Sequence, residues 1–123
     1  MSAKILIADD EPFIARSLSY VLEKSGYEIY LARDGEEALR RAIDVKPDLV
    51  FLDLMMPKKN GYEVCSEIRN HPELQNVPII LITAKGQKAD LERGLEAGAN
   101  EYMTKPFSPT QVVARVKQVL GAS

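Results

Sequence analysis

The stretch Leu49-Val50-Phe51-Leu52-Asp53 decides the fold, because four apolar residues in a row end on one carboxylate. A short run that is apolar at every position is typical of a strand buried on both faces, as in a parallel sheet. Asp53 would then stand at the carboxyl end of a central strand, where open α/β sheets place their ligands. A carboxylate there stays charged only if a cation or hydrogen-bond donors meet it, so the rest of the chain must supply them.

Length and composition restrict the class of protein. The chain has 123 residues, 46% of them hydrophobic and 28% charged, which predicts a single globular domain over residues 1–123. The net charge of −2 gives no general attraction to nucleic acid, and the single cysteine, Cys65, excludes an internal disulfide. With no apolar run of membrane-spanning length and no signal-peptide pattern, we expect a soluble, cytoplasmic domain without a nucleic-acid or membrane partner.

Predicted strands alternate with predicted helices along the whole chain. The strands are expected over residues 4–8, 27–32, 49–53, 77–82 and 100–104. A helix is expected after each of them, beginning near Pro12, Asp34, Asn60, Lys88 and Pro109. Such alternation, with short loops, predicts an α/β fold with a five-stranded parallel sheet and helices on both faces.

Local signals mark the helix ends and one buried face. Asp34 with Glu37, Asn60 with Glu63, and Ser108 with Gln111 have the spacing of capping boxes. In the first helix, the apolar residues predicted to form one buried face are Phe13, Ile14, Leu18, Val21 and Leu22.

Polar residues stand at the carboxyl ends of four predicted strands. They are Asp9 with Asp10, then Asp53, Thr83 and Lys105. Each one alone has an ordinary explanation as a cap, a turn former or a solvated side chain. The carboxyl ends of parallel strands share one edge of the sheet, however, so these residues are expected to converge.

The converging groups predict a particular chemistry. Clustered carboxylates repel one another unless a cation joins them, and hard oxygen ligands at an open strand edge suit Mg²⁺. One carboxylate can also act as a nucleophile toward phosphorus and form an acyl phosphate. That reaction needs a fixed cation and a hydroxyl donor at the phosphoryl oxygens, which Lys105 and Thr83 would provide for Asp53.

Together these segments resemble the response-regulator receiver domains of two-component signalling. The likeness is carried by four motifs: Ile7-Ala8-Asp9-Asp10-Glu11, Leu52-Asp53-Leu54-Met55-Met56-Pro57 with Gly61, Leu81-Ile82-Thr83-Ala84, and Lys105-Pro106-Phe107. The resemblance covers the whole chain and implies a CheY-like, flavodoxin-like (βα)5 fold with strand order 2-1-3-4-5.

The resemblance implies a role for each matching residue. Asp53 would accept a phosphoryl group from the phosphohistidine of a sensor histidine kinase or a phosphotransfer protein. Asp10 would bind Mg²⁺ directly and Asp9 would assist, while Asp53 and the carbonyl of Met55 would complete the protein ligands. Thr83 and Lys105 would bind the phosphoryl oxygens. The peptide bond before Pro106 is expected to be cis.

The same resemblance implies a signalling switch rather than a conventional enzyme, since the chain would catalyse only its own phosphorylation and dephosphorylation. Thr83 would move toward the phosphoryl group, and Tyr102, at the aromatic switch position, would move inward. The surface of the fourth helix, fifth strand and fifth helix would then change to control a downstream partner or dimerisation. On residue type alone, Tyr102 is more often a half-buried core aromatic.

The last third of the chain resembles the OmpR/PhoB-type branch, whose receivers dimerise through that surface with charge pairs. The candidates for a phosphorylation-dependent homodimer here are Arg93, Glu96, Glu101, Arg115 and Lys117. Asn100 stands where an Asp is usual, which removes one pair. Solvated surface charges, worth little each, are the alternative explanation.

Other interpretations fit less well. A haloacid-dehalogenase-like phosphatase needs a second Asp where Met55 stands, and a flavodoxin-like electron carrier needs a phosphate loop where Asp9-Asp10-Glu11 stands. A scaffolding pseudo-receiver usually lacks the acids or the lysine. The sequence leaves open whether the chain is a stand-alone receiver with a protein partner or part of a longer regulator with its own output domain.

Overall fold

The computed structural model describes residues 2–84 and 88–121, in which five strands alternate with five helices. The strands are β1 (Lys4–Ala8), β2 (Glu28–Ala32), β3 (Leu49–Asp53), β4 (Ile79–Thr83) and β5 (Glu101–Thr104). The helices are α1 (Pro12–Lys24), α2 (Gly35–Val45), α3 (Gly61–Asn70), α4 (Lys88–Ala97) and α5 (Pro109–Leu120). None of the helices described is long and apolar enough to cross a membrane.

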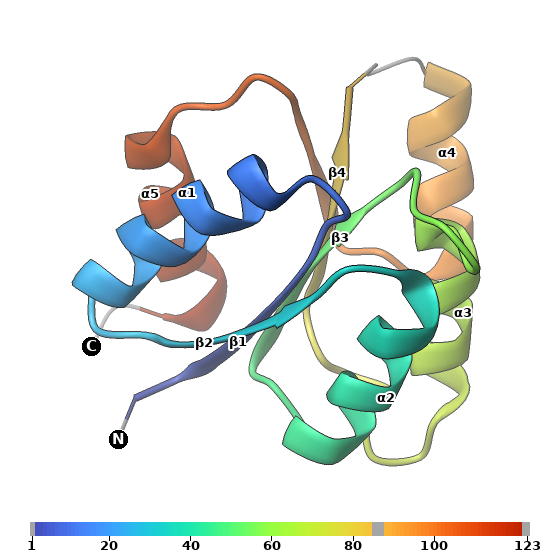
Figure 1. Cartoon of the computed structure of the whole chain (residues 1–123). Helices are drawn as coiled ribbons and strands as arrows, with labels where there is room; N and C mark the ends of the chain where they lie inside the picture. Colours follow the sequence, from blue (N-terminus) through green and yellow to red (C-terminus); the bar gives the residue numbers. More distant parts are fainter. Residues whose placement is uncertain (1, 85–87, 122–123) are drawn as a thin grey trace.

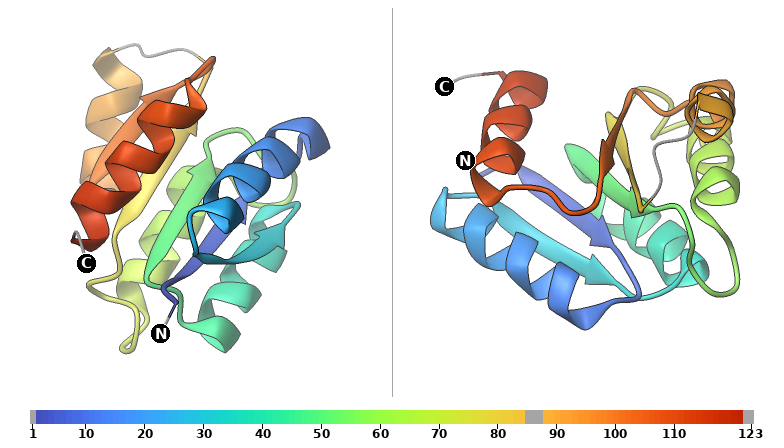
Figure 2. Two further views of the ribbon diagram at one scale, coloured as in Figure 1. Left: turned by 90° about the vertical axis from the view of Figure 1, so that its left-hand side faces the viewer. Right: turned by 90° about the horizontal axis from the view of Figure 1, so that it is seen from above.

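The strands form one parallel sheet in the order β2-β1-β3-β4-β5, so the predicted flavodoxin-like topology is confirmed. Helices α1 and α5 cover one face of the sheet, and α2, α3 and α4 cover the other (Figure 1). The same three-layer arrangement is visible along two further directions (Figure 2). β3 is central, and all five of its residues are buried.

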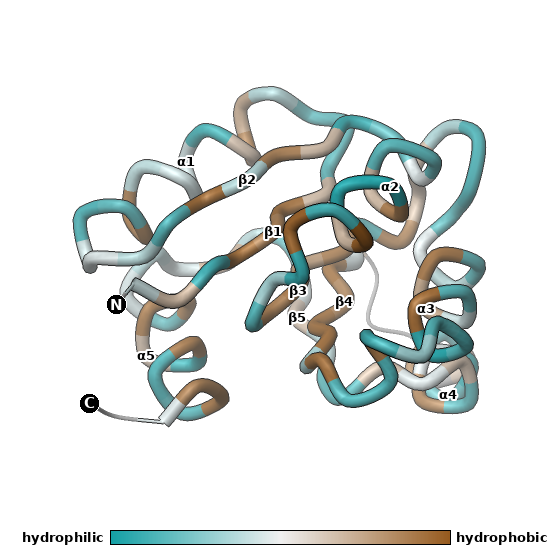
Figure 3. The backbone as a smooth tube through the Cα atoms, turned by 90° about the horizontal axis from the view of Figure 1, so that it is seen from below, coloured by the Kyte–Doolittle hydropathy of each residue, from teal (hydrophilic) through white to brown (hydrophobic). Residues whose placement is uncertain are grey.

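The core consists of two separate clusters, one on each face of the sheet, because successive strand residues point to opposite faces. Val50 and Leu52 belong to the cluster under α2 and α3, whereas Phe51 packs with residues of α1 and α5. The hydrophobic residues accordingly concentrate along the strands, and the outer turns of the helices are hydrophilic (Figure 3).

Side-chain caps fix three helix starts as predicted. The Glu37 N–H donates to Asp34 Oδ1 at 2.8 Å. At Asn60 the box is complete, because the Glu63 N–H donates to the Asn60 side chain at 3.0 Å and the Asn60 N–H donates to Glu63 at 3.2 Å. At Ser108 the hydroxyl accepts from the Gln111 N–H at 3.5 Å, which is the one half of the predicted box found in the part of the chain described.

The predicted buried face of α1 is wrong at Phe13, whose side chain is 78% exposed. Ala15, Leu18 and Leu22 are the buried residues of this helix. Phe13 precedes Leu18 by five residues, which places it about 140° away around the helix. Phe13 therefore lies on the solvent side.

Helix α4 contributes little to the core. Of its described side-chain positions, only Gly94 is buried. Tyr62 of α3 connects the two helices: its hydroxyl donates to the Asp90 carbonyl at 3.1 Å, and the Arg93 guanidinium lies 4.3 Å from its ring centroid. Polar and cation–π contacts thus hold α4 more than burial does.

Arg69 of α3 fastens the amino-terminal end of β4 to the turn before β5. It donates to the carbonyls of Gly98 at 2.8 Å and Val77 at 2.7 Å, and to Asn100 Oδ1 at 2.7 Å. The same oxygen of Asn100 accepts from the Ile79 N–H at 2.8 Å. The side-chain oxygen of Asn100 is therefore occupied by hydrogen bonds within the chain.

Gly35→Ala is expected to destabilise the fold by about 1–3 kcal/mol, because an added Cβ would lie 2.1 Å from the Lys59 carbonyl oxygen. Gly94→Ala is the matched control, since its Cβ would meet the flexible end of the Leu81 side chain, at 2.6 Å, and the Tyr62 ring at an ordinary contact distance of 3.9 Å. Its effect should stay within about 1 kcal/mol. Urea unfolding measures the stability of both variants. Equal losses of stability would show that the loop after β3 moves to make room for the added methyl group on α2.

Candidate functional site

The strand ends bring the predicted polar residues together. Asp9 directly follows β1, Asp53 and Thr83 are the last residues of β3 and β4, and Lys105 directly follows β5. Pairing continues to this edge, because Asp53 is in register with Ile82 and the Lys105 N–H donates to the Thr83 carbonyl at 2.8 Å. The peptide bond between Lys105 and Pro106 is cis.

Three carboxylates form the centre of this edge. Asp9 and Asp53 are buried, at 1% and 5% exposure, whereas Asp10 is exposed. One oxygen from each lies within 4.8 Å of the other two. The Glu11 N–H donates to Asp9 Oδ1 at 2.9 Å, and the Met55 N–H lies 3.4 Å from Asp53 Oδ1.

Burial makes the ionised form of Asp53 unfavourable. Desolvation, followed by the charge of Asp9, raises the pKa of Asp53 to about 7, although the charge of Lys105 partly opposes this rise. A carboxyl group that titrates near neutrality in a cluster of charges is typical of a functional site.

Lys105 places its ammonium group among the carboxylates. Its Nζ lies 3.1 Å from Glu11 Oε1, 3.2 Å from Asp9 Oδ2 and 3.7 Å from Asp53 Oδ2. Burial of Lys105 disfavours its charge, but the hydrogen bond with Glu11 and the charges of Asp53 and Asp9 outweigh this and raise the pKa of Lys105. Lys105 is thus a fixed cation at the site.

The carboxylate cluster fits a hard divalent cation. Asp9 Oδ2 is buried and accepts no hydrogen bond from the residues described, so its one close partner there is the Lys105 ammonium. A buried carboxylate oxygen of this kind, beside two further carboxylates, is the donor set that Mg²⁺ prefers. Met55 is 77% exposed, and its thioether sulfur is a soft ligand that does not suit Mg²⁺, so its backbone carbonyl is the group that fits the predicted set.

Thr83 and Tyr102 both line a small apolar cavity under α4. Leu54, Leu81 and Gly94 also line this cavity. Thr83 is buried, at 6% exposure, while the Tyr102 side chain is 44% exposed. Tyr102 therefore occupies an outward position in this structure, next to a space that borders Thr83.

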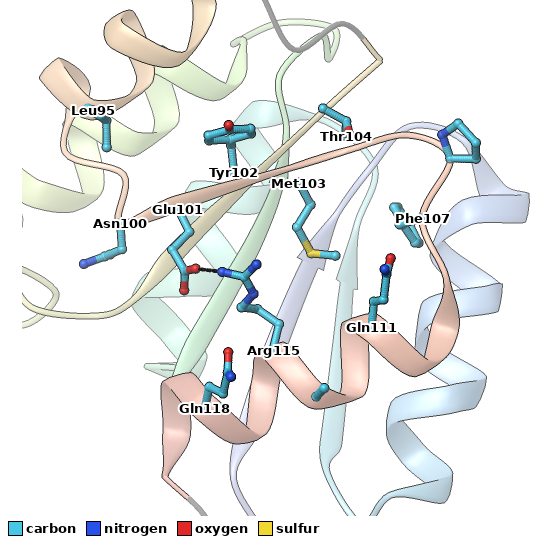
Figure 4. A pocket seen from close by; sticks show the side chains of 12 residues that line it. Leu95, Asn100, Glu101, Tyr102, Met103, Thr104, Phe107, Gln111, Arg115 and Gln118 are labelled. Atoms are coloured by element: carbon cyan, nitrogen blue, oxygen red, sulfur yellow. Dashed lines mark hydrogen bonds and ion pairs between the residues drawn. The ribbon is translucent and has the colours of Figure 1, made fainter.

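A groove of about 770 Å³ runs between β5 and α5, beside Tyr102 (Figure 4). Met103, Phe107 and Gln111 line one part of it, and the ion pair between Arg115 and Glu101 crosses it. Sequence reasoning proposed these two charges for contacts between two copies of the chain. The structure pairs them within one chain.

The other dimer candidates differ in their surroundings. Arg93 stacks on Tyr62. Glu96 and Lys117 are exposed, and neither has an ion-pair partner among residues 2–84 and 88–121.

Sequence reasoning missed the contact of Glu11 with Lys105. The only signal for it was a third acid directly after Asp9 and Asp10.

Comparisons with known proteins identify the family of the chain. The model of the response regulator receiver domain family matches residues 5–117. The chain is 51% identical over 123 residues to the alkaline phosphatase synthesis transcriptional regulatory protein PhoP of Bacillus subtilis. The aligned region covers all of this chain but 50% of that relative's length.

Solved structures are similar over nearly the whole length. The chemotaxis response regulator CheY4 of Vibrio cholerae is 31% identical with a TM-score of 0.93, over 98% of this chain and 100% of that one. A two-component response regulator from Clostridium difficile is 30% identical with a TM-score of 0.92, over 98% of both chains. Because that family's model matches most of the sequence, the chain belongs to the response regulator receiver domain family.

Proposed function

We propose that this chain is a phosphorylation-dependent signalling switch in which Asp53 accepts a phosphoryl group from a histidine kinase or a phosphotransfer protein. The observation that carries the proposal is the burial of Asp53 beside Asp9, with the Lys105 ammonium 3.7 Å from Asp53 Oδ2. A carboxylate oxygen near a fixed cation at an open strand edge can attack an incoming phosphoryl group. Membership of the receiver family supports the same assignment.

In the proposed transfer, an oxygen of Asp53 forms a bond to phosphorus while the phosphorus–nitrogen bond of the phosphohistidine breaks. The imidazole keeps the electron pair and takes up a proton, and Asp53 becomes an acyl phosphate. Lys105 offsets negative charge on the phosphoryl oxygens, and the Thr83 hydroxyl donates to another of these oxygens. The chain would thus catalyse only its own phosphorylation and dephosphorylation, without turnover of a separate substrate.

Asp9, Asp10, Asp53 and the Met55 carbonyl would hold Mg²⁺, whose charge neutralises phosphoryl oxygens when it is bound. The carboxylate cluster and the buried Asp9 oxygen support this assignment. Asp10 is the exposed member of this set of ligands.

The proposed output is a change of the surface formed by α4, β5 and α5. Thr83 would move toward the phosphoryl group, and Tyr102 would turn into the cavity that both residues border. The groove beside Tyr102 would then bind a downstream partner, an output domain of the same protein or a second copy of the chain. PhoP, a transcriptional regulatory protein about twice as long as this chain, supports an attached output domain.

Acetyl phosphate with Mg²⁺ is expected to add one phosphoryl group to the wild-type chain, detected by intact-protein mass spectrometry. Asp53→Asn should give no adduct, and EDTA should prevent it. Asp44→Asn, an exposed position on α2, is the matched control and should react as the wild type does. An equal adduct on Asp53→Asn would overturn the assignment of Asp53 as the phosphoryl acceptor. Gel filtration of the phosphorylated wild type tests whether the chain dimerises.

A further inference from the structure

Glu11 competes with Asp53 for the ammonium group of Lys105. The Lys105 Nζ lies closest to Glu11 Oε1, at 3.1 Å, and farthest from Asp53 Oδ2, at 3.7 Å. The Asp53 side chain is 7% exposed, whereas that of Glu11 is 59% exposed. Glu11 is therefore the partner that can leave Lys105 and be solvated elsewhere without moving the core.

Glu11 also stands at the N-cap of α1, and its side chain makes no capping hydrogen bond there. No residue in the first turn of α1 is acidic. Negative charge is favourable at a helix N-terminus, where the first N–H groups have no partner within the helix. Contact with Lys105, 94 residues away along the chain, holds the Glu11 carboxylate away from amides that it would otherwise stabilise.

We propose that Glu11 is a positioning residue that holds Lys105 away from Asp53 until Asp53 is phosphorylated, and that phosphorylation then releases Glu11 to the N-terminus of α1. This inference rests on the proposed function. A phosphoryl group on Asp53 offers Lys105 more negative charge than the carboxylate alone, and charge-assisted hydrogen bonds to phosphoryl oxygens are strong. Lys105 then moves to the phosphoryl group, and Glu11 loses its partner.

The released Glu11 can accept from the N–H groups of Phe13 and Ile14, the second and third residues of α1. The exposed Phe13 side chain lies on this same turn. A protein that contacts Phe13 would meet a different arrangement of charge before and after phosphorylation. This second readout lies on α1, on the opposite side of the sheet from α4 (Figure 1).

The test uses nuclear magnetic resonance of the isotope-labelled chain, with Mg²⁺ and beryllofluoride in place of the phosphoryl group. Glu11→Gln keeps the side-chain shape and removes the charge. Glu23→Gln removes the same charge at the other end of α1 and is the control. The signals followed are the Lys105 ammonium group and the amides of Phe13, Ile14, Asp53 and Thr83.

In the wild type and Glu23→Gln, beryllofluoride should shift the Lys105 ammonium signal and slow hydrogen exchange at Phe13 and Ile14 by about two- to fivefold, as a charge at a helix N-terminus would. In Glu11→Gln, that protection should be absent, and the Lys105 signal should already differ before beryllofluoride is added. A purely structural role of Glu11 would leave the protection that beryllofluoride gives to Phe13 and Ile14 unchanged in Glu11→Gln.

Three other results are decisive. The same protection in Glu11→Gln as in the wild type would overturn the role of Glu11. A wild type whose Asp53 and Thr83 amides respond, while Phe13 and Ile14 do not, would overturn this inference and leave the proposed function standing. A wild type in which none of these amides responds would overturn both.

Discussion

Asp53→Asn is expected to be more stable than the wild type in EDTA. The difference in unfolding free energy should grow as the pH rises from 4 and reach about 2–4 kcal/mol at pH 7. The pKa of Asp53 is raised from 3.8 to about 7 in the folded chain, mainly by burial and then by the charge of Asp9. Over this range the folded state keeps a proton that the unfolded state has released. Rising pH therefore destabilises the wild type through this group, and the asparagine variant lacks the effect.

Urea unfolding followed by circular dichroism at several pH values measures the difference between the two proteins. Asp44→Asn removes a carboxylate from an exposed position on α2 and should run parallel to the wild type. Added Mg²⁺ should stabilise the wild type more than Asp53→Asn, because the ion offsets the repulsion between Asp53 and Asp9. A difference that does not change with pH would mean that Asp53 titrates near its ordinary pKa.

Lys105→Met is expected to destabilise the chain by about 2–4 kcal/mol at pH 8 in EDTA, because it leaves buried carboxylates without their cation. The side chain of Lys105 is 13% exposed and that of Asp9 is 0% exposed, so water screens this pair weakly. Phosphorylation by acetyl phosphate should also slow by at least about a hundredfold, the loss typical when one fixed charge-stabilising donor is removed.

Lys46→Met is the matched control, since it breaks the exposed pair of Lys46 and Glu73, whose side chains are 50% and 61% exposed. Its cost should stay below about 1 kcal/mol. Adding Asp53→Asn to Lys105→Met should recover part of the lost stability, because one of the two unpaired charges is then gone. Equal costs for the two lysines, or no recovery in the double variant, would contradict a shared charge network.

The elements that sequence reasoning predicted well obey local rules. The all-apolar run before Asp53 is the buried central strand, and the cap at Asp34 and the complete box at Asn60 begin α2 and α3 as predicted. The convergence of Asp9, Asp53 and Lys105 followed from a single rule, the shared edge of parallel strands.

What sequence reasoning missed depends on distances between segments far apart in the chain. The contact between Glu11 and Lys105, and the hydrogen bond of Arg69 with Asn100, join segments that no periodicity connects. Phe13 was misplaced because apolar residue type was weighed above its angle around α1. The dimer charges needed side-chain geometry, which shows Arg115 already paired with Glu101.

Helix α4 buries few of its side chains, so moving it costs little free energy. Of the described side-chain positions of that helix, only Gly94 is buried, so shifting it exposes little apolar surface. Segments with few buried contacts open at free energies well below that of global unfolding. A single covalent modification shifts an equilibrium only by the difference in its interaction with the two states. Such a difference in free energy is enough to shift α4, which is held by Tyr62 and a few polar contacts. It is not enough to shift α1 and α5, whose buried leucines and valines pack in the core.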